Sequence, residues 1–194
     1  MRRYIPHVRD STSSAVVLDA DVCRITGRVL WNEIENSITS LSKEQVKTLE
    51  LRDVPAPEVQ KILDHLPFVP RSVGISLSNW SDADFIKFGD YWFRGDTKRT
   101  NSLRLSNLFT ECSAGLLNFV KRYRKSRCKL RTLVLNNLQV SPDDPETFFA
   151  SFASLVLYNS PHSNIGLYNL RIKHIKLGTQ GLLALAHKLA TNST

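Results

Sequence analysis

The sequence predicts an α/β fold in which parallel strands line one face of a single domain and helices cover the other. Three observations support this prediction. Apolar residues recur with spacings of three, two and three positions in five copies along the chain. The centre of each copy alternates with a period of two, as in a short strand, and the residues that follow have helical spacing. Such a strand-helix repeat is typical of a solenoid.

Five units match the template, and each contributes four aligned positions. These are Val46, Leu49, Leu51, Val54; Ser72, Ile75, Leu77, Trp80; Thr100, Leu103, Leu105, Leu108; Leu130, Leu133, Leu135, Leu138; and Leu167, Leu170, Ile172, Ile175. We expect the two central residues of each unit to be buried. A slip of one residue would exchange core for surface throughout a strand.

The chain divides into a basic, flexible N-terminus at residues 1–14 and one repeat domain at 15–194. A degenerate unit is predicted at 15–45, with one strand at 15–25 and a helix whose apolar face contains Val29, Leu30, Ile34 and Ile38. The five regular units occupy about 46–194. An insertion loop is expected at 152–165, between the fourth helix and the strand of the last unit.

Each regular strand should be followed by a helix with a recognisable start. Pro57 suits a first helical turn, and Ser81 with Asp84 forms a capping-box pattern. The third helix should bury Leu116 and Val120, and the fourth should begin near Asp144. The apolar stripe of the last helix is predicted to contain Leu182, Leu183, Leu185, Ala186 and Leu189.

The L-x-x-L-x-L pattern resembles that of leucine-rich repeat proteins. The segment from Leu170 to Asn192, with Gly178 and Gly181 at the expected turn, is similar to the ribonuclease-inhibitor class. This resemblance implies strands on the concave face, helices on the convex face, and work as a scaffold, inhibitor or adaptor. The stretch from Asp84 to Leu105 also resembles F-box-associated repeat regions.

One feature departs from the family pattern. The polar residue that usually follows the strand is replaced by Val54, Trp80, Leu108, Leu138 and Ile175. Polar residues lie one position earlier, at Asp53, Asn79, Asn107, Asn137 and His174. We expect the polar ladder between neighbouring repeats to be displaced or lost.

Composition limits the class of protein. The 194 residues carry a net charge of +8, and 42% of them are hydrophobic, a content too high for a disordered tail. No apolar stretch reaches the roughly 20 residues of a membrane-spanning helix. Cys23, Cys112 and Cys128 form no metal-binding or disulfide pattern, which favours a reducing compartment. We expect an intracellular, cytoplasmic protein, with the nucleus and a transit peptide as alternatives.

No catalytic motif is present. The five histidines form no HExxH motif, and no GxGxxG, P-loop, GxSxG or EF-hand pattern occurs. His174 is predicted to make a turn hydrogen bond. We therefore predict a protein that is not an enzyme and uses no cofactor, metal or small-molecule substrate.

The residues that alternate with the strand leucines should face outward on the concave side, where extended repeat proteins bind partners. Their small hydroxyl groups leave room for a close approach, and their basic groups can bond carboxylates or phosphates. The candidate partner-binding residues are Arg52, Ser76, Ser78, Arg104, Ser106, Asn136, Arg171 and Lys173. This pattern predicts an adaptor or scaffold that binds an acidic protein segment.

A second concentration of basic charge lies on the third predicted helix and its exit. This basic patch contains Lys121, Arg122, Arg124, Lys125, Arg127, Lys129 and Arg131, with no acidic residue among them. Nucleic acid or an acidic lipid surface could bind such a patch by salt-sensitive attraction. RNA binding is therefore the alternative function.

Overall fold

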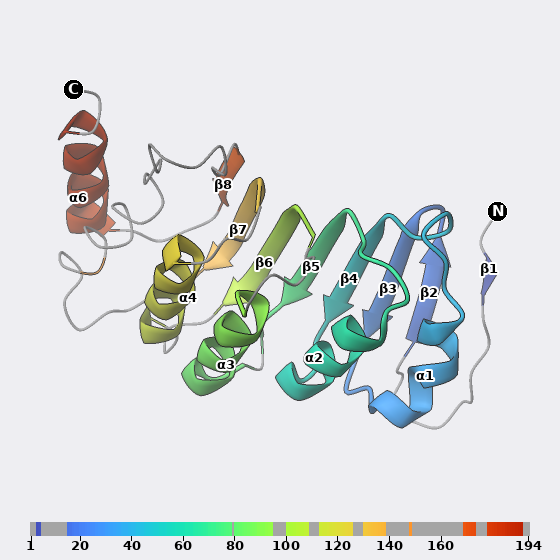
Figure 1. Cartoon of the computed structure of the whole chain (residues 1–194). Coiled ribbons are helices and arrows are strands. Elements are labelled where there is room, and N and C mark those ends of the chain that lie inside the picture. The colour runs from blue at the N-terminus through green and yellow to red at the C-terminus, as the bar shows by residue number, and fades with distance from the viewer. Residues whose placement is uncertain are drawn as a thin grey trace.

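The computed structural model describes the chain at residues 3–4, 15–78, 80–94, 100–108, 113–125, 130–138, 148, 169–173 and 178–191. These residues form an α/β fold with one sheet of eight strands in sequential order. Within the described residues, five helices are present. Helices α1 to α4 lie along one side of the sheet (Figure 1).

Most of the sheet is parallel. Six strands follow one another in sequence order, and each pairs in parallel with its neighbour. They are β3 (Val22–Thr26), β4 (Thr48–Arg52), β5 (Ser72–Ser76), β6 (Ser102–Leu108), β7 (Thr132–Leu138) and β8 (Asn169–Lys173). Strands that are parallel neighbours need a long crossover connection between them. Four of these connections contain helices, namely α1 (Trp31–Thr39), α2 (Ala56–His65), α3 (Asp82–Trp92) and α4 (Ser113–Lys125). The strand-then-helix order predicted from the repeat is confirmed for these segments.

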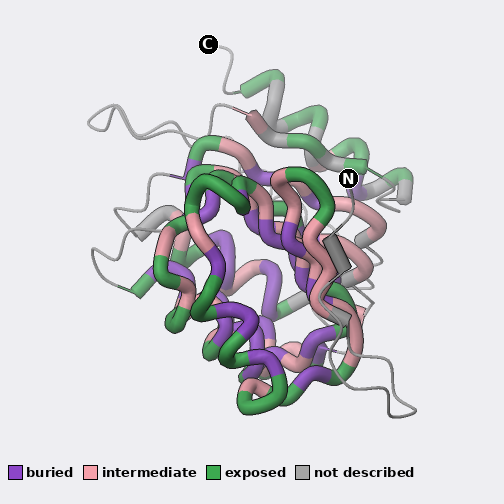
Figure 2. Tube along the Cα trace, turned by 90° about the vertical axis from the view of Figure 1, so that its right-hand side faces the viewer, coloured by how far each residue is buried: buried purple, intermediate pink, exposed green. Residues whose placement is uncertain are grey.

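The core lies between the sheet and these helices, as the buried segments in Figure 2 show. Six of the eight leucine-type residues expected in the core are buried, namely Leu49, Leu51, Leu103, Leu105, Leu133 and Leu135. The side chains of the other two, Leu170 and Ile172, lie outside the described residues. The predicted alternation between core and surface is therefore confirmed from β4 to β7.

The predicted alignment of the second unit is wrong by two residues. Leu49 pairs with Val73 rather than Ile75, and Leu51 pairs with Ile75. The strand starts earlier because the Arg71 and Ser72 amides both donate to the Lys47 carbonyl. The side-chain period of a strand is two, so this slip leaves Ile75 in the core and Gly74 and Ser76 on the opposite face, as predicted.

The degenerate first strand is instead an antiparallel hairpin. Strand β2 (Ala15–Asp19) turns back into β3 at Ala20, which has a positive φ of 52°. An alanine at this conformation is uncommon, which explains why the turn was missed. A short strand β1 (Arg3–Tyr4), within the segment predicted to be flexible, pairs with β2. In α1, Val29, Ile34 and Ile38 are buried as predicted, whereas Leu30 is 54% exposed at the N-cap.

Helices α3 and α4 form the most tightly packed part of the helical layer. Ser81 and Asp84 make the predicted capping box of α3, each bonding the backbone amide of the other. The Phe119 ring of α4 stacks on Phe85 with centroids 5.3 Å apart, and Phe93 meets its edge at 4.8 Å. Aromatic pairs of this kind add to the energy of burial.

The last helix, α6 (Gly178–Thr191), does not match its predicted apolar stripe. Leu182 and Leu183 are 58% and 65% exposed, Ala186 is also exposed, and the side chains of Leu185 and Leu189 are not described. Gly178 and Gly181 lie inside the helix rather than in a turn before it. Figure 1 shows α6 apart from α4. In the described segments, no helix is both long and apolar enough to span a membrane.

Candidate functional site

The candidate site lies on the sheet face opposite α1 to α4, called the open face here. Its side chains form rows across the strands because the parallel register aligns them. One row contains Arg24, Glu50, Gly74, Arg104, Val134 and Arg171. The next contains Ser76, Ser106, Asn136 and Lys173. All eight predicted partner-binding residues thus lie on this face or at the end of β5, where Ser78 follows the strand.

A hollow of about 470 Å³ opens on this face over β4, β5 and β6. Its wall includes six of the predicted residues, namely Arg52, Ser76, Ser78, Arg104, Ser106 and Asn136, but not Arg171 or Lys173. Gly74 forms part of the floor. A methyl group added there would come no closer than 3.8 Å to a neighbour, so the missing side chain leaves space rather than relieving a clash.

One end of the open face carries a three-residue ion cluster of Arg24, Glu50 and Arg52. The Glu50 carboxylate accepts from Arg24 Nε at 2.9 Å and from an Arg52 terminal nitrogen at 2.8 Å, both through Oε2. Burial alone would raise the pKa of the Glu50 carboxyl. The hydrogen bonds and charges of the two arginines outweigh burial and hold that pKa below its ordinary value. Glu50 therefore stays ionised and cancels one of the two cations.

The cations at the other end of the open face differ from those of the ion cluster in their contacts. Arg104 on β6 and Arg171 and Lys173 on β8 are exposed. Within the described part of the chain, none of these three has a carboxylate in salt-bridge distance. The hollow itself is lined by two cations, Arg52 and Arg104, and by two anions, Glu50 and Asp53. The net positive charge of the open face therefore comes from Arg24, Arg171 and Lys173, which do not line the hollow.

A polar ladder follows the carboxyl ends of β5 to β7. Asn137 Nδ2 donates to Asn107 Oδ1 at 2.9 Å, and Asn107 Nδ2 donates to Ser76 Oγ at 3.1 Å. Both asparagines have a positive φ, 53° and 57°, as does Asp53 at the end of β4, with 58°. Asparagine and aspartate tolerate this left-handed conformation better than most residues. The polar ladder is therefore displaced by one position, which is one of the two outcomes expected from the sequence. Asn79 and His174 lie outside the described residues.

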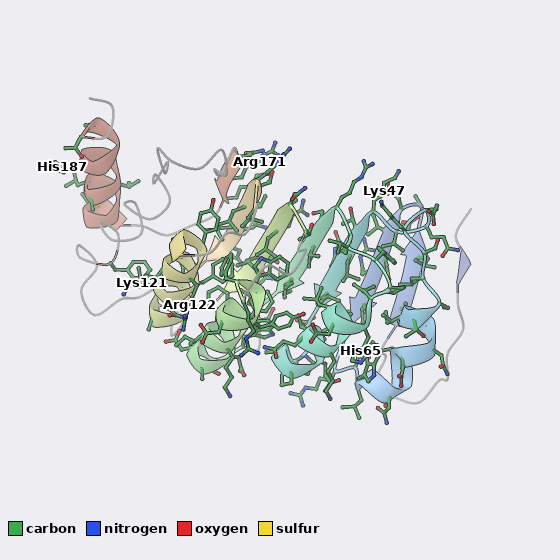
Figure 3. The ribbon with its side chains drawn as sticks, viewed as in Figure 1. Lys47, His65, Lys121, Arg122, Arg171 and His187 are labelled. Atoms are coloured by element: carbon green, nitrogen blue, oxygen red, sulfur yellow. The ribbon has the colours of Figure 1, made fainter. Side chains whose placement is uncertain are left out.

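The basic patch on α4 is only partly described. Lys121 and Arg122 are exposed on α4, on the helix side of the molecule (Figure 3), and Arg131 is exposed just before β7. The backbone of Arg124 and Lys125 lies in α4 without a description of their side chains, and Arg127 and Lys129 are outside the described residues. Arg122 Nε contacts Asp90 Oδ1 of α3 at 2.6 Å. Arg122 is therefore paired with an acidic residue of a separate helix, although the segment 121–131 itself contains none.

Sequence reasoning missed two residues of the open face. Arg24 was overlooked because β2 and β3 were read as one strand, which hid its pairing with Glu50. Ser72 was assigned to the core template, yet its hydroxyl donates to Ser102 Oγ on the open face at 3.3 Å. Its position next to Val73 in the strand alternation would have placed it correctly.

The reactive side chains do not gather into a second site. Cys23 is fully buried in the core, and burial raises the pKa of its thiol to about 12. His65 bonds the Lys61 carbonyl through Nδ1 at 2.8 Å and packs against the Trp31 ring. Among the described residues, no three His, Cys, Asp or Glu side chains are grouped to hold a metal ion.

The fold and this site can be set beside known proteins. Comparison of the chain with protein families, with curated proteins and with solved structures finds no match.

Proposed function

We propose that the chain is an irregular leucine-rich-repeat solenoid that works as an adaptor or scaffold and binds an acidic protein segment on its open face. The repeat assignment draws support from the shared register of β3 to β8 and from the left-handed polar corners at Asp53, Asn107 and Asn137. The proposed activity is binding rather than catalysis, because the site offers a long row of donors without a nucleophile and base in contact.

The observation that carries the proposal is the set of cations at Arg104, Arg171 and Lys173, which meet no carboxylate among the described residues. Like charges gathered on one face of a sheet repel one another and so do not stabilise the fold. A carboxylate partner would relieve that repulsion and accept charge-assisted hydrogen bonds. The adjacent hydroxyl and amide groups of Ser106 and Asn136 can bond the backbone of the same partner.

RNA binding through α4 has less support. Arg122, near the start of the basic patch, forms an ion pair with Asp90 and is less available to a phosphate. This ion pair also joins α3 to α4, so a charge reversal at Arg122 would disturb packing as well as charge. A test of the patch is therefore better placed at Lys121, which is exposed on the same helix.

A pair of matched variants tests the proposal. Arg104→Glu with Arg171→Glu reverses two charges on the open face, and Lys87→Glu with Lys121→Glu reverses two exposed charges on the helices. Fluorescence anisotropy with a labelled glutamate-rich peptide and with a labelled oligouridylate measures both ligand classes. We expect peptide binding to fall about tenfold or more in the open-face variant and to change little in the helix variant.

A block of the hollow gives an independent check. Gly74→Val adds a side chain that suits a strand, and its Cβ would lie no closer than 3.8 Å to a neighbouring atom, so the fold should persist while the floor of the hollow fills. Reduced peptide binding is expected. Equal loss in both charge-reversal variants, or tight oligouridylate binding that only the helix variant abolishes, would overturn the adaptor proposal.

A further inference from the structure

We infer that the bound segment carries two acidic residues three positions apart and crosses the strands in an extended, polyproline-like conformation. This inference rests on the proposed function and specifies its ligand. It follows from the spacing of Arg104 and Arg171, the two cations in the row from Glu50 to Arg171, which meet no carboxylate among the described residues.

The cations of that row lie on alternate strands. Arg104 pairs in register with Val134, and Val134 with Arg171, so the two arginines are separated by two strand steps. Neighbouring strands lie about 4.8 Å apart, which places the two positions about 9.6 Å from each other. Val134 between them is uncharged and half-buried, so the row has no third cation between the two arginines.

A ligand laid along the row must present acidic side chains at the same interval. A polyproline II segment has three residues per turn and rises about 3.1 Å per residue, so residues three apart point the same way about 9.3 Å apart. A β-strand instead repeats on one side at about 6.8 Å and about 13.6 Å. The polyproline spacing fits the two arginines, and the strand spacing does not.

The backbone of such a ligand would find donors in the adjoining row. Polyproline II has no internal hydrogen bonds, so its carbonyl groups need partners outside the segment. The row of Ser106, Asn136 and Lys173 runs parallel to the arginine row and carries hydroxyl, amide and ammonium groups. The open face thus offers charge contacts and backbone contacts at the same time.

The ion cluster limits the pattern to two acids. Glu50 lies two strand steps from Arg104 on the side away from Arg171. A third acidic residue in the same spacing would face the ionised Glu50 carboxylate and be repelled. Between Glu50 and Arg104, the hollow over Gly74 has room for an uncharged side chain.

Peptides of equal charge test the spacing. Each labelled peptide has two glutamates in a proline-rich, otherwise neutral background, separated by one, two, three or five positions. We expect the three-position peptide to bind the full chain about threefold to fivefold more tightly than the others, as measured by anisotropy at low salt. Arg171→Gln should remove this preference. The control variant Lys87→Gln, at an exposed helix residue, should leave it intact.

The outcomes separate the inference from the proposed function. If all four peptides bind equally and all lose affinity with Arg104→Glu and Arg171→Glu, the spacing is refuted while the acidic-segment proposal stands. If no acidic peptide binds, or if binding is unaffected by the open-face variants, both are refuted. A preference for the two-position peptide would indicate a β-strand ligand and would also overturn the inference.

Discussion

The glycines on the helix side of the sheet are closely packed, whereas the glycine on the open face borders empty space. On the helix side, Gly89 and Gly115 let α3 and α4 approach closely: an added methyl group would lie 3.3 Å from the Phe119 Cα at the first position and 3.0 Å from Phe85 and Asp82 at the second. On the open face, Gly74 has no neighbour closer than 3.8 Å to the same added atom. The first two glycines serve packing, whereas the third leaves a space unfilled.

This contrast separates stability from binding. The helix side buries Phe85, Phe88 and Phe119 in contact with one another, and its energy comes from close packing. The open face carries polar and charged side chains, several without partners among the described residues. Substitutions of buried residues on the helix side should therefore cost much more stability than substitutions on the open face, whose main effect should be on binding.

The largest effect is expected at Phe119, which is fully buried beneath α3. Phe119→Ala should lower the free energy of unfolding by about 3–5 kcal/mol, because it removes a large buried ring and leaves a cavity. Phe119→Leu, a milder change, keeps the loss measurable by urea denaturation if the alanine variant fails to fold. Val134→Ala on the open face is the control and should cost less than about 1 kcal/mol. Equal losses at the two positions would contradict the contrast.

Alanine substitutions at two glycines, one on each side of the sheet, form a matched pair and should change the stability by smaller amounts. Gly115→Ala should destabilise the fold by about 1–3 kcal/mol, because its methyl group overpacks the contact with Phe85. Gly74→Ala should stabilise it by about 0.5–1 kcal/mol, since alanine loses less chain entropy in a strand. Thermal unfolding of both variants checks the signs. A loss of stability at Gly74 would show that the hollow is required by the fold.

The smallest effect concerns the Glu50 ion cluster. The pKa of this carboxyl is lower in the folded chain than its ordinary value of 4.5, so the ion pairs stabilise the fold above that value. The contribution is lost as the pH falls through the lowered pKa. Glu50→Gln should therefore cost less than about 1 kcal/mol near pH 7 and almost nothing near pH 3. Urea denaturation at both pH values tests this; a cost that does not shrink in acid would argue against the ion pairs.

Much of the architecture could be predicted from local pattern. Alternation around Leu49 and Leu51 assigned the buried and open faces, and Ser81 with Asp84 marked the start of α3 correctly. The errors arose where local pattern is ambiguous. Val73, Ile75 and Leu77 are all apolar at the strand period, so the sequence allowed two alignments of β5. The amphipathic pattern of α6 predicted burial of Leu182 and Leu183, but burial needs a neighbouring surface, and both are exposed.

The sequence by itself determined which residues share a face, because the two-residue period of a strand is a local property of the chain. It also supplied the basic and hydroxyl groups of the open face. Only the tertiary structure decided which charges meet. Arg24 and Glu50 are brought together by the register of β3 and β4, and Arg122 and Asp90 by the packing of α4 on α3. Those contacts depend on distances between separate elements, which is why the cations of β6 and β8 that meet no carboxylate among the described residues emerged only from the folded chain.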